Sequence, residues 1–277
     1  MMISWGHDFP FGFLEVPEKE RLHAVRAAGF DAVMIHWEAM NGVDACARYD
    51  AVVQAGLDVH TVHFPQEHTA DFWREGDAGD RLTDQAVQAV REIGERGIAH
   101  MVVHTTRRLE TPEPGPIGAR RFARIAEAGE KYGVNIALEN TRFLHYNQYL
   151  FRHIDSPRLR FCYDCGHNHC FTPGEDALGM FADRLVTTHL HDNHGARDEH
   201  LLIGEGDIDL PALFLRLVRM GVDQFNLESR YIPAPGKRPW TLGEYIEKAY
   251  RRLRRYTEQA ETDFHAGNGV EDTFKIL

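Results

Sequence analysis

The sequence has no apolar run close to the ~20 residues that a membrane-spanning helix needs. Its first residues, MMISWGHDFP, lack the charged segment and following apolar stretch that are typical of a secretory signal. We therefore expect a cytoplasmic protein that does not enter membranes. Assembly of identical subunits is compatible with the sequence, which does not determine the oligomeric state.

Cysteine is scarce, since four in 277 residues are too few for a disulfide framework in a chain of this length. Cys162, Cys165 and Cys170 lie in FCYDCGHNHC together with His167 and His169. A closed structural zinc site would need a second ligand pair at a suitable spacing. The segment also overlaps the end of an expected strand whose aspartate fits a different scheme, which we prefer.

Positive charge is also in deficit, with 31 Lys and Arg against 42 Asp and Glu and a formal net charge of −11. Because affinity for phosphate backbones depends on clustered Lys and Arg, this balance disfavours a nucleic-acid partner. Carboxylates that hold a metal would account for part of the excess of negative charge. A solvated acidic surface explains most of that excess at least as well.

What the sequence does contain is a repeated alternation of helical segments that end in glycine and short apolar runs, as in KYGV-NIALE and RMGV-DQFNL. Glycine supplies the left-handed position after a helix, and runs of 4–8 apolar residues suit strands buried on both faces. The pattern predicts βαβ units and a parallel sheet. The expected strands lie at residues 2–5, 31–36, 57–63, 100–104, 134–139, 159–164, 185–191 and 223–228. The expected helices lie at residues 17–28, 43–55, 80–96, 117–131, 145–153, 175–183, 210–220 and 240–259.

Eight strand–helix units in 277 residues fit one α/β (β/α)₈ TIM barrel of roughly 250 residues. We expect the barrel to occupy residues 1–262, followed by a C-terminal tail at 263–277. The active site of such a barrel lies at the C-terminal rim of the strands.

Six of the apolar, strand-like runs stop at a residue type that binds divalent metals: His63, His104, Glu139, Asp164, His189 and Glu228. Because a parallel barrel gathers its strand C-termini at one rim, these side chains should converge on one mouth. Imidazole and carboxylate ligands together suit Zn²⁺, Mn²⁺, Fe²⁺ or Co²⁺ better than Ca²⁺. The sequence thus predicts a metalloenzyme.

Glu139 and Glu228 end the fifth and eighth expected strands, on roughly opposite sides of the rim. Two carboxylates across a pocket can share a metal and flank a substrate, so that one removes a proton and the other returns one. A buried carboxylate without a partner is costly. The alternative is therefore a structural salt bridge at the barrel end.

Neighbouring residues add further candidates. In D-C-G-H the glycine is expected to permit a turn that brings His167 back toward the mouth. His189 and His191 would point the same way but differ in height by roughly 6.6 Å, so one should be the principal ligand. Trp37 just follows a strand end and could wall a sugar-sized pocket.

The segment THLHDNHGARDEHLLIGEGDID at 188–209 resembles the signature H-x-[NKH]-D…D-x-H…G-x-G-x-I of the xylose isomerase-like TIM-barrel superfamily. That superfamily includes sugar isomerases and epimerases and the endonuclease IV-type enzymes. ALENT, YDCGH and NLES resemble its other strand ends, so that the similarity spans nearly the whole chain.

The resemblance implies a core metal site of Glu139, Asp164, His189 and Glu228. In the epimerase branch the two glutamates also act as the acid/base pair, and His167 would contact the substrate. His200 stands where those epimerases carry an arginine, and we expect it to orient substrate hydroxyls as well.

The endonuclease IV-type branch holds three zinc ions with those four residues and five more, which match His63, His104, His167, Asp198 and His200. All nine positions are present. This completeness supports a multi-zinc phosphodiester hydrolase as an alternative, whereas the acidic charge and the absence of an evident basic loop for DNA count against it.

We therefore predict a metal-dependent isomerase or epimerase of a small sugar or sugar-derived carbonyl, acting through an enediolate. A lyase or dehydratase on the same scaffold is a further alternative. One divalent metal (Mn, Zn, Co, Fe or Mg) is expected, and up to three are possible. The sequence leaves open whether the substrate is phosphorylated, although several arginines after strand ends could hold a phosphate: Arg107, Arg108, Arg142, Arg197 and Arg230.

Overall fold

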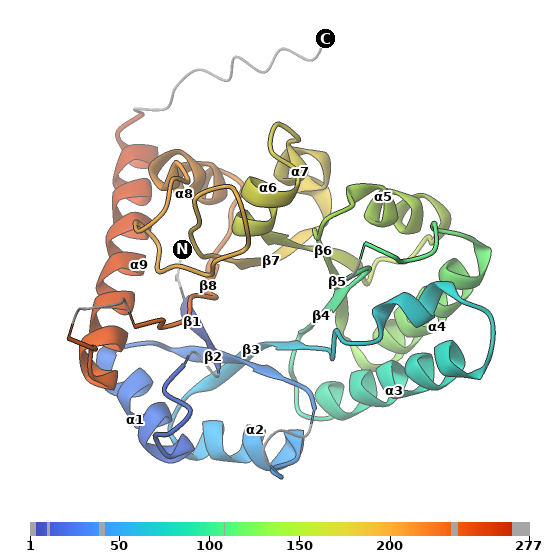
Figure 1. Ribbon diagram of the computed structural model, residues 1–277, viewed down its shortest axis with the longest axis horizontal. Helices are drawn as coiled ribbons and strands as arrows, with labels where there is room; N and C mark the ends of the chain where they lie inside the picture. The colour runs from blue at the N-terminus through green and yellow to red at the C-terminus, as the bar shows by residue number, and fades with distance from the viewer. Residues whose placement is uncertain (1–3, 10–11, 39–41, 108, 234–237, 268–277) are drawn as a thin grey trace.

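Eight parallel strands form a barrel surrounded by helices (Figure 1). The computed structural model describes residues 4–9, 12–38, 42–107, 109–233 and 238–267. The strands are β1 (Ser4–Phe9), β2 (Ala32–His36), β3 (Asp58–His63), β4 (His100–His104), β5 (Asn135–Glu139), β6 (Leu159–Asp164), β7 (Leu185–His189) and β8 (Gln224–Leu227). Strands that are consecutive in sequence pair from β1 to β7, β8 pairs with β1, and a bridge from Leu190 to Leu227 joins the remaining edges. The predicted (β/α)₈ fold is confirmed.

The longer helices follow the strands in the expected alternation. They are α1 (Glu18–Ala28), α2 (Ala45–Gln54), α3 (Asp77–Gly94), α4 (Pro116–Tyr132), α5 (Leu144–His153), α8 (Leu210–Arg219) and α9 (Leu242–His265). The segment expected to form one helix at 175–183 contains the short α7 (Ala177–Met180) and leads into a 3₁₀ turn at Ala182–Arg184, and α6 (Cys165–Phe171) is a short helix that was not expected. α9 extends to His265, and residues 268–277 of the expected tail lie outside the described residues.

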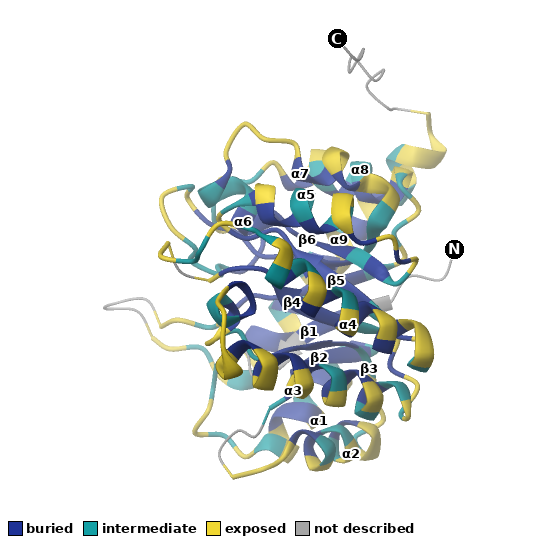
Figure 2. Cartoon of the chain, turned by 90° about the vertical axis from the view of Figure 1, so that its right-hand side faces the viewer, coloured by how far each residue is buried: buried dark blue, intermediate teal, exposed yellow. Residues whose placement is uncertain are grey.

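The helices pack apolar residues against the outside of the barrel. Figure 2 shows their buried faces turned inward and their exposed faces turned to solvent. Inside the barrel, side chains of alternate strand residues form layers, as the pleat requires. A small apolar cluster of Val102, Ala137 and Cys162 occupies the middle layer. One step toward the C-terminal rim, His104 and Glu139 lie in contact. The apolar middle layer therefore separates the polar rim from the opposite end of the barrel.

Two further predictions concern compartment and cysteine. None of the described helices combines the length and the apolar character that a membrane span requires. All four cysteines are free, as expected from their number. Burial raises the pKa of the Cys162 thiol to about 12, so it packs as a neutral thiol in the middle layer.

At the N-terminal end of the barrel, His100 is held neutral. Burial, together with the nearby His60 and Arg158, lowers the pKa of His100 to about 4. The Asn135 side-chain N–H group donates to its Nδ1, which a neutral imidazole can accept (3.1 Å). Since the unfolded chain binds the proton near pH 6.5, this residue stabilises the fold fully above that pH. That contribution is lost as the pH falls toward 4.

We expect His100→Gln, which keeps an acceptor for Asn135, to weaken this pH dependence. Between pH 7 and pH 5 the variant should lose about 2 kcal/mol less free energy of unfolding than the unsubstituted protein. Urea unfolding at both pH values measures the difference, and His23→Gln at an exposed position serves as the control. Equal losses in the two proteins would contradict a neutral buried His100.

Candidate metal centre

The four residues expected to form the core site converge at the C-terminal rim. Glu139, Asp164 and His189 end β5, β6 and β7, and Glu228 directly follows β8. All four are buried, and one ligand atom from each lies within 4.8 Å of the others. Glu139 and Glu228 stand three strands apart around the eight-stranded barrel, roughly across the rim as expected. Their ligand atoms nevertheless lie close enough to share one cation.

His189 lies at the centre of this group. Its Nδ1 is 3.1 Å from Glu228 Oε2, 3.3 Å from Glu139 Oε2 and 3.9 Å from Asp164 Oδ2. Nevertheless, both ring nitrogens are buried without a hydrogen bond, and so is Glu228 Oε2. Buried polar atoms that lack a hydrogen bond are costly. The imidazole nitrogen and the three carboxylate oxygens face one another but are not aligned for hydrogen bonds. Together they form a set of metal-ligand atoms that a divalent cation would satisfy.

The electrostatics of the two glutamates agree with this donor set. Burial by itself would raise the pKa of Glu139, but the imidazoles of His104, His189 and His167 outweigh it and hold that pKa well below its usual range. Burial also opposes ionisation of Glu228, and His189 and His200 likewise hold its pKa low. Both carboxylates are therefore ionised, as metal ligands must be.

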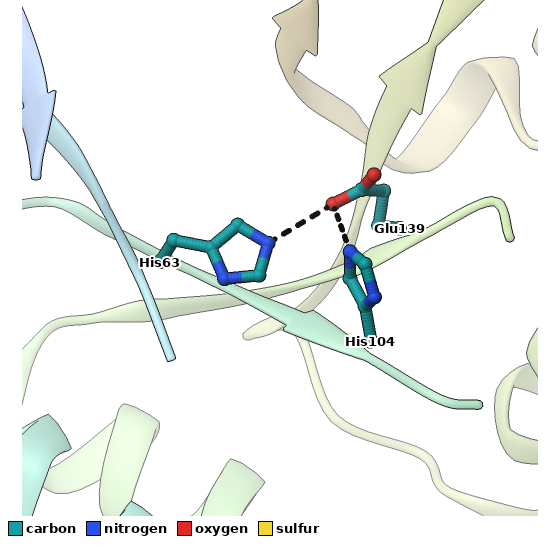
Figure 3. Close-up of side chains that lie close together, drawn as sticks. All are labelled: His63, His104 and Glu139. Atoms are coloured by element: carbon teal, nitrogen blue, oxygen red, sulfur yellow. Dashed lines mark hydrogen bonds and ion pairs between the residues drawn. The ribbon is translucent and has the colours of Figure 1, made fainter. Parts of the chain in front are cut away.

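A second group lies beside the first, toward β3 and β4 (Figure 3). Glu139 Oε2 is 3.0 Å from His104 Nε2 and 3.4 Å from His63 Nε2. His63 Nδ1 lies 2.7 Å from the carbonyl oxygen of Phe64, which can only accept, so Nδ1 carries the proton. In the neutral ring, Nε2 then presents its lone pair toward Glu139.

A third group lies on the other side of the core. His167 Nε2 is 3.3 Å and His200 Nε2 is 3.1 Å from Asp198 Oδ2. Both rings place Nδ1 against a backbone carbonyl, that of Asn140 at 3.0 Å and that of Glu228 at 2.8 Å. The Nδ1 protons fix the tautomers, so each Nε2 faces the carboxylate as an acceptor facing an acceptor. A cation, either a proton or a metal, is required between them.

The strand-to-helix turn after β6 positions two of these residues. Asp164 is the N-cap of α6, and its Oδ1 accepts from the backbone N–H of His167 (2.6 Å). The Asn140 side chain bonds both the N–H and the C=O of Asp164 at 2.7 Å. Gly166 lies in the first turn of α6 and has no positive φ. A Cβ there would lie 1.9 Å from His191, so glycine is needed because the imidazole approaches the backbone closely.

Both His189 and His191 turn inward, although only one belongs to the core group. His191 Nε2 is 3.1 Å from Asp164 Oδ1, and its ring stacks on His200 at 4.2 Å. His191 thus orients a core carboxylate and supports His200. Neither role was evident from the two-residue spacing alone.

Asp192, the aspartate of the H-x-[NKH]-D signature, is a positioning residue whose role was not predicted from the sequence. Its fully buried carboxylate accepts backbone N–H groups of Asn193 at 3.0 Å, Gly204 at 2.9 Å and Ile208 at 3.2 Å. A Cβ on Gly206 would lie 2.5 Å from the same carboxylate. The G-x-G-x-I segment therefore folds around Asp192, and the intervening loop carries Asp198 and His200. The pairing of this aspartate with the spaced glycines in one signature is the signal that could have indicated such a role.

We expect Asp192→Ala to destabilise the fold by roughly 4 kcal/mol, because three hydrogen bonds to a buried charged acceptor are lost together. Asp192→Asn keeps the shape and should cost less. Urea unfolding measures both, with Asp207→Ala on the exposed side of the same loop as the control. Unchanged stability of Asp192→Ala would show that the loop does not depend on this carboxylate.

A pocket of about 340 Å³ opens above the core group. Its lining includes His104, His167, Asp198, His200 and Glu228. Trp37, expected to wall the pocket, is not part of this lining. It is 5% exposed, its indole N–H donates to Glu92 at 2.8 Å, and Arg96 lies over its ring. The structure thus places Trp37 against α3 and away from the pocket.

Comparison with known proteins agrees with this architecture. The family model described as the xylose isomerase-like TIM barrel matches residues 22–260. The uncharacterized protein y4fM of Sinorhizobium fredii is 27% identical over 235 residues, which cover 70% of this chain and 75% of that protein.

Two solved structures are similar over nearly the full chain. A structure of L-ribulose 3-epimerase has a TM-score of 0.77 at 18% identity, covering 98% of this chain and 100% of that one. A D-tagatose 3-epimerase-like protein has a TM-score of 0.71 at 22% identity, covering 95% and 100%. At these identities the likeness establishes a shared fold.

Proposed function

The chain belongs to the xylose isomerase-like TIM-barrel family, and on that premise we propose that it is a divalent-metal-dependent isomerase or epimerase of a small sugar or sugar-derived carbonyl. The observation that carries the proposal is the convergence of three buried carboxylates on His189, whose ring nitrogens have no hydrogen bond. The epimerase structures that share the fold support the same reaction class. The proposed core ligands are Glu139, Asp164, His189 and Glu228.

A divalent cation held by these residues would supply a Lewis acid for the carbonyl and adjacent hydroxyl oxygens of a sugar, and so acidify the neighbouring C–H bond. Glu228 faces the open pocket and is placed to take that proton at a carboxylate oxygen. Glu139, 1% exposed beneath the pocket, is the partner carboxylate that would return it. His167 and His200 line the same pocket and would orient hydroxyl groups.

Exchange of substrate hydrogen with solvent tests this proposal before the natural substrate is known. The metal-loaded protein would be incubated in D₂O with a panel of ketoses, aldoses and their phosphates, and deuterium at carbon measured by NMR. The expected result is incorporation next to the carbonyl of one sugar class together with its epimer or isomer. Loss of water from the substrate would instead indicate a lyase or dehydratase. No exchange with any of these compounds would count against the proposal.

A multi-metal phosphodiester hydrolase is the second candidate, favoured by the tautomers of His63, His167 and His200. Each Nδ1 donates to a backbone carbonyl, so each Nε2 is available to a metal beside a carboxylate. This function predicts three zinc ions per chain and cleavage of DNA that contains abasic sites. Zinc-loaded protein that leaves such DNA intact would remove it.

A further inference from the structure

The wall of the pocket carries three arginines, although the chain as a whole is acidic. Arg107, Arg142 and Arg230 line the pocket above the carboxylates of the proposed metal centre. The formal net charge of the chain is −11, so a basic rim is not a property of the surface in general. The chemical group that these guanidinium groups bind helps to identify the substrate class, an inference that rests on the proposed function.

Two of the three arginines have no acidic partner among the described residues. Arg107 forms an ion pair with Glu67. Arg142 and Arg230 are in no ion pair with any residue that the structure describes. An unpaired guanidinium at the wall of a pocket can give two parallel hydrogen bonds to a carboxylate or a phosphate.

The positions of these two arginines relate them to the proposed chemistry. Arg142 is three residues after Glu139, and Arg230 is two residues after Glu228. The Arg142 guanidinium lies 3.8 Å over the ring of Phe171, which in turn stacks on His167 with ring centres 5.2 Å apart. This stacking restricts Arg142 in orientation, so less conformational entropy is lost when it binds a ligand.

The backbone holds the second arginine in a similar way. The N–H of Arg230 donates to the carbonyl oxygen of His200 at 2.9 Å. His200 lines the pocket and carries positive φ (49°), so the contact joins the start of the β8 loop to the long loop after β7. Arg142 is therefore held through its side chain and Arg230 through its backbone, each by a residue that lines the pocket.

We infer that the substrate carries an anionic group, a carboxylate or a phosphate, which Arg142 and Arg230 bind at the pocket wall while the carbonyl end of the substrate reaches the proposed metal centre. The carboxylates of that centre would repel an anion, so cations above them are needed to orient such a molecule in one direction. A volume of about 340 Å³ suits a small molecule of this kind. Arg142 and Arg230 are thus assigned as residues that determine specificity.

Equilibrium binding to metal-loaded protein tests the assignment without requiring turnover. Calorimetry would compare D-fructose, D-fructose 6-phosphate and the keto-acid sugar D-fructuronate. One charged sugar should bind at least about tenfold more tightly than fructose, and its identity tells phosphate from carboxylate. Arg142→Gln and Arg230→Gln should each weaken that binding about tenfold and leave fructose unchanged. Arg197→Gln, which lies on the mouth loop but pairs with Glu199, is the matched control.

Several outcomes would overturn the assignment. The assignment is wrong if all three sugars bind equally, or if the variants weaken the binding of neutral and charged sugars alike. Binding of abasic DNA that needs both arginines, with no binding of either charged sugar, would also overturn it. The D₂O exchange assay is read separately. If a charged sugar binds in a way that depends on the arginines but no hydrogen exchange occurs, the inference holds and the proposed isomerase or epimerase function is wrong. If exchange occurs and the two arginine variants do not affect it, the proposed function holds and the inference is wrong.

Discussion

Glu228→Gln should lower turnover by about 10³-fold or more, within or above the range that a positioned acid or base contributes. The amide cannot take a proton from carbon. The substitution also removes one anionic ligand of the proposed metal, since the native Oε2 lies 3.1 Å from His189 Nδ1 in the core group. Glu139→Gln should cause a comparable loss. The initial rate of deuterium incorporation and of product formation, on the sugar identified by the exchange panel, measures both.

The two variants are expected to differ in metal retention. Glu139 Oε2 faces His104, His63 and His189 at 3.0–3.4 Å, so its replacement disturbs two ligand groups at once. Elemental analysis of each purified variant therefore accompanies the rates. Glu199→Gln, on the mouth loop but outside the pocket lining, should keep turnover, and unchanged far-UV circular dichroism would show that each variant folds. Full activity in both Glu139→Gln and Glu228→Gln would disprove the acid/base assignment.

The convergence at the rim could be predicted from sequence because it depends on topology alone. Once the alternation of strands and helices indicates a parallel barrel, the last residue of each strand must lie at one rim. His104 and Glu139 are then neighbours through the pairing of β4 with β5, whatever the loops do. The first strand was less predictable. The expected strand covered residues 2–5 (MISW), whereas pairing with β2 and β8 extends β1 through the more polar residues to Phe9.

Features that depend on distant partners could not be predicted. The indole of Trp37 turns toward α3 because Glu92, 55 residues away, offers it an acceptor. The need for glycine at position 166 comes from His191, which lies two residues after the end of the neighbouring strand β7. Asp192 acts through N–H groups 12 and 16 residues further on. In each case the decisive contact is set by tertiary packing, which local patterns do not encode.

Removal of metal should destabilise the protein as well as inactivate it. Without a cation, the carboxylates of Glu139, Asp164 and Glu228 surround His189 in a buried site and repel one another. Metal at 100–1,000 times its dissociation constant stabilises the folded state by about 3–4 kcal/mol. For a chain of this size that corresponds to roughly 10 °C in melting temperature.

Calorimetric melts of chelator-treated protein, before and after addition of Mn²⁺, Co²⁺ or Zn²⁺, measure the shift. His189→Ala should abolish it because the central ligand is lost, whereas His153→Gln, an exposed imidazole on α5, should retain it. The number of ions bound then separates the two candidate functions. One per chain fits the core group and the isomerase, whereas three would engage the groups around His63 and Asp198 and favour the hydrolase. If neither chelator nor added metal changes the melting temperature and no ion is bound, these carboxylates are stabilised by protonated histidines alone.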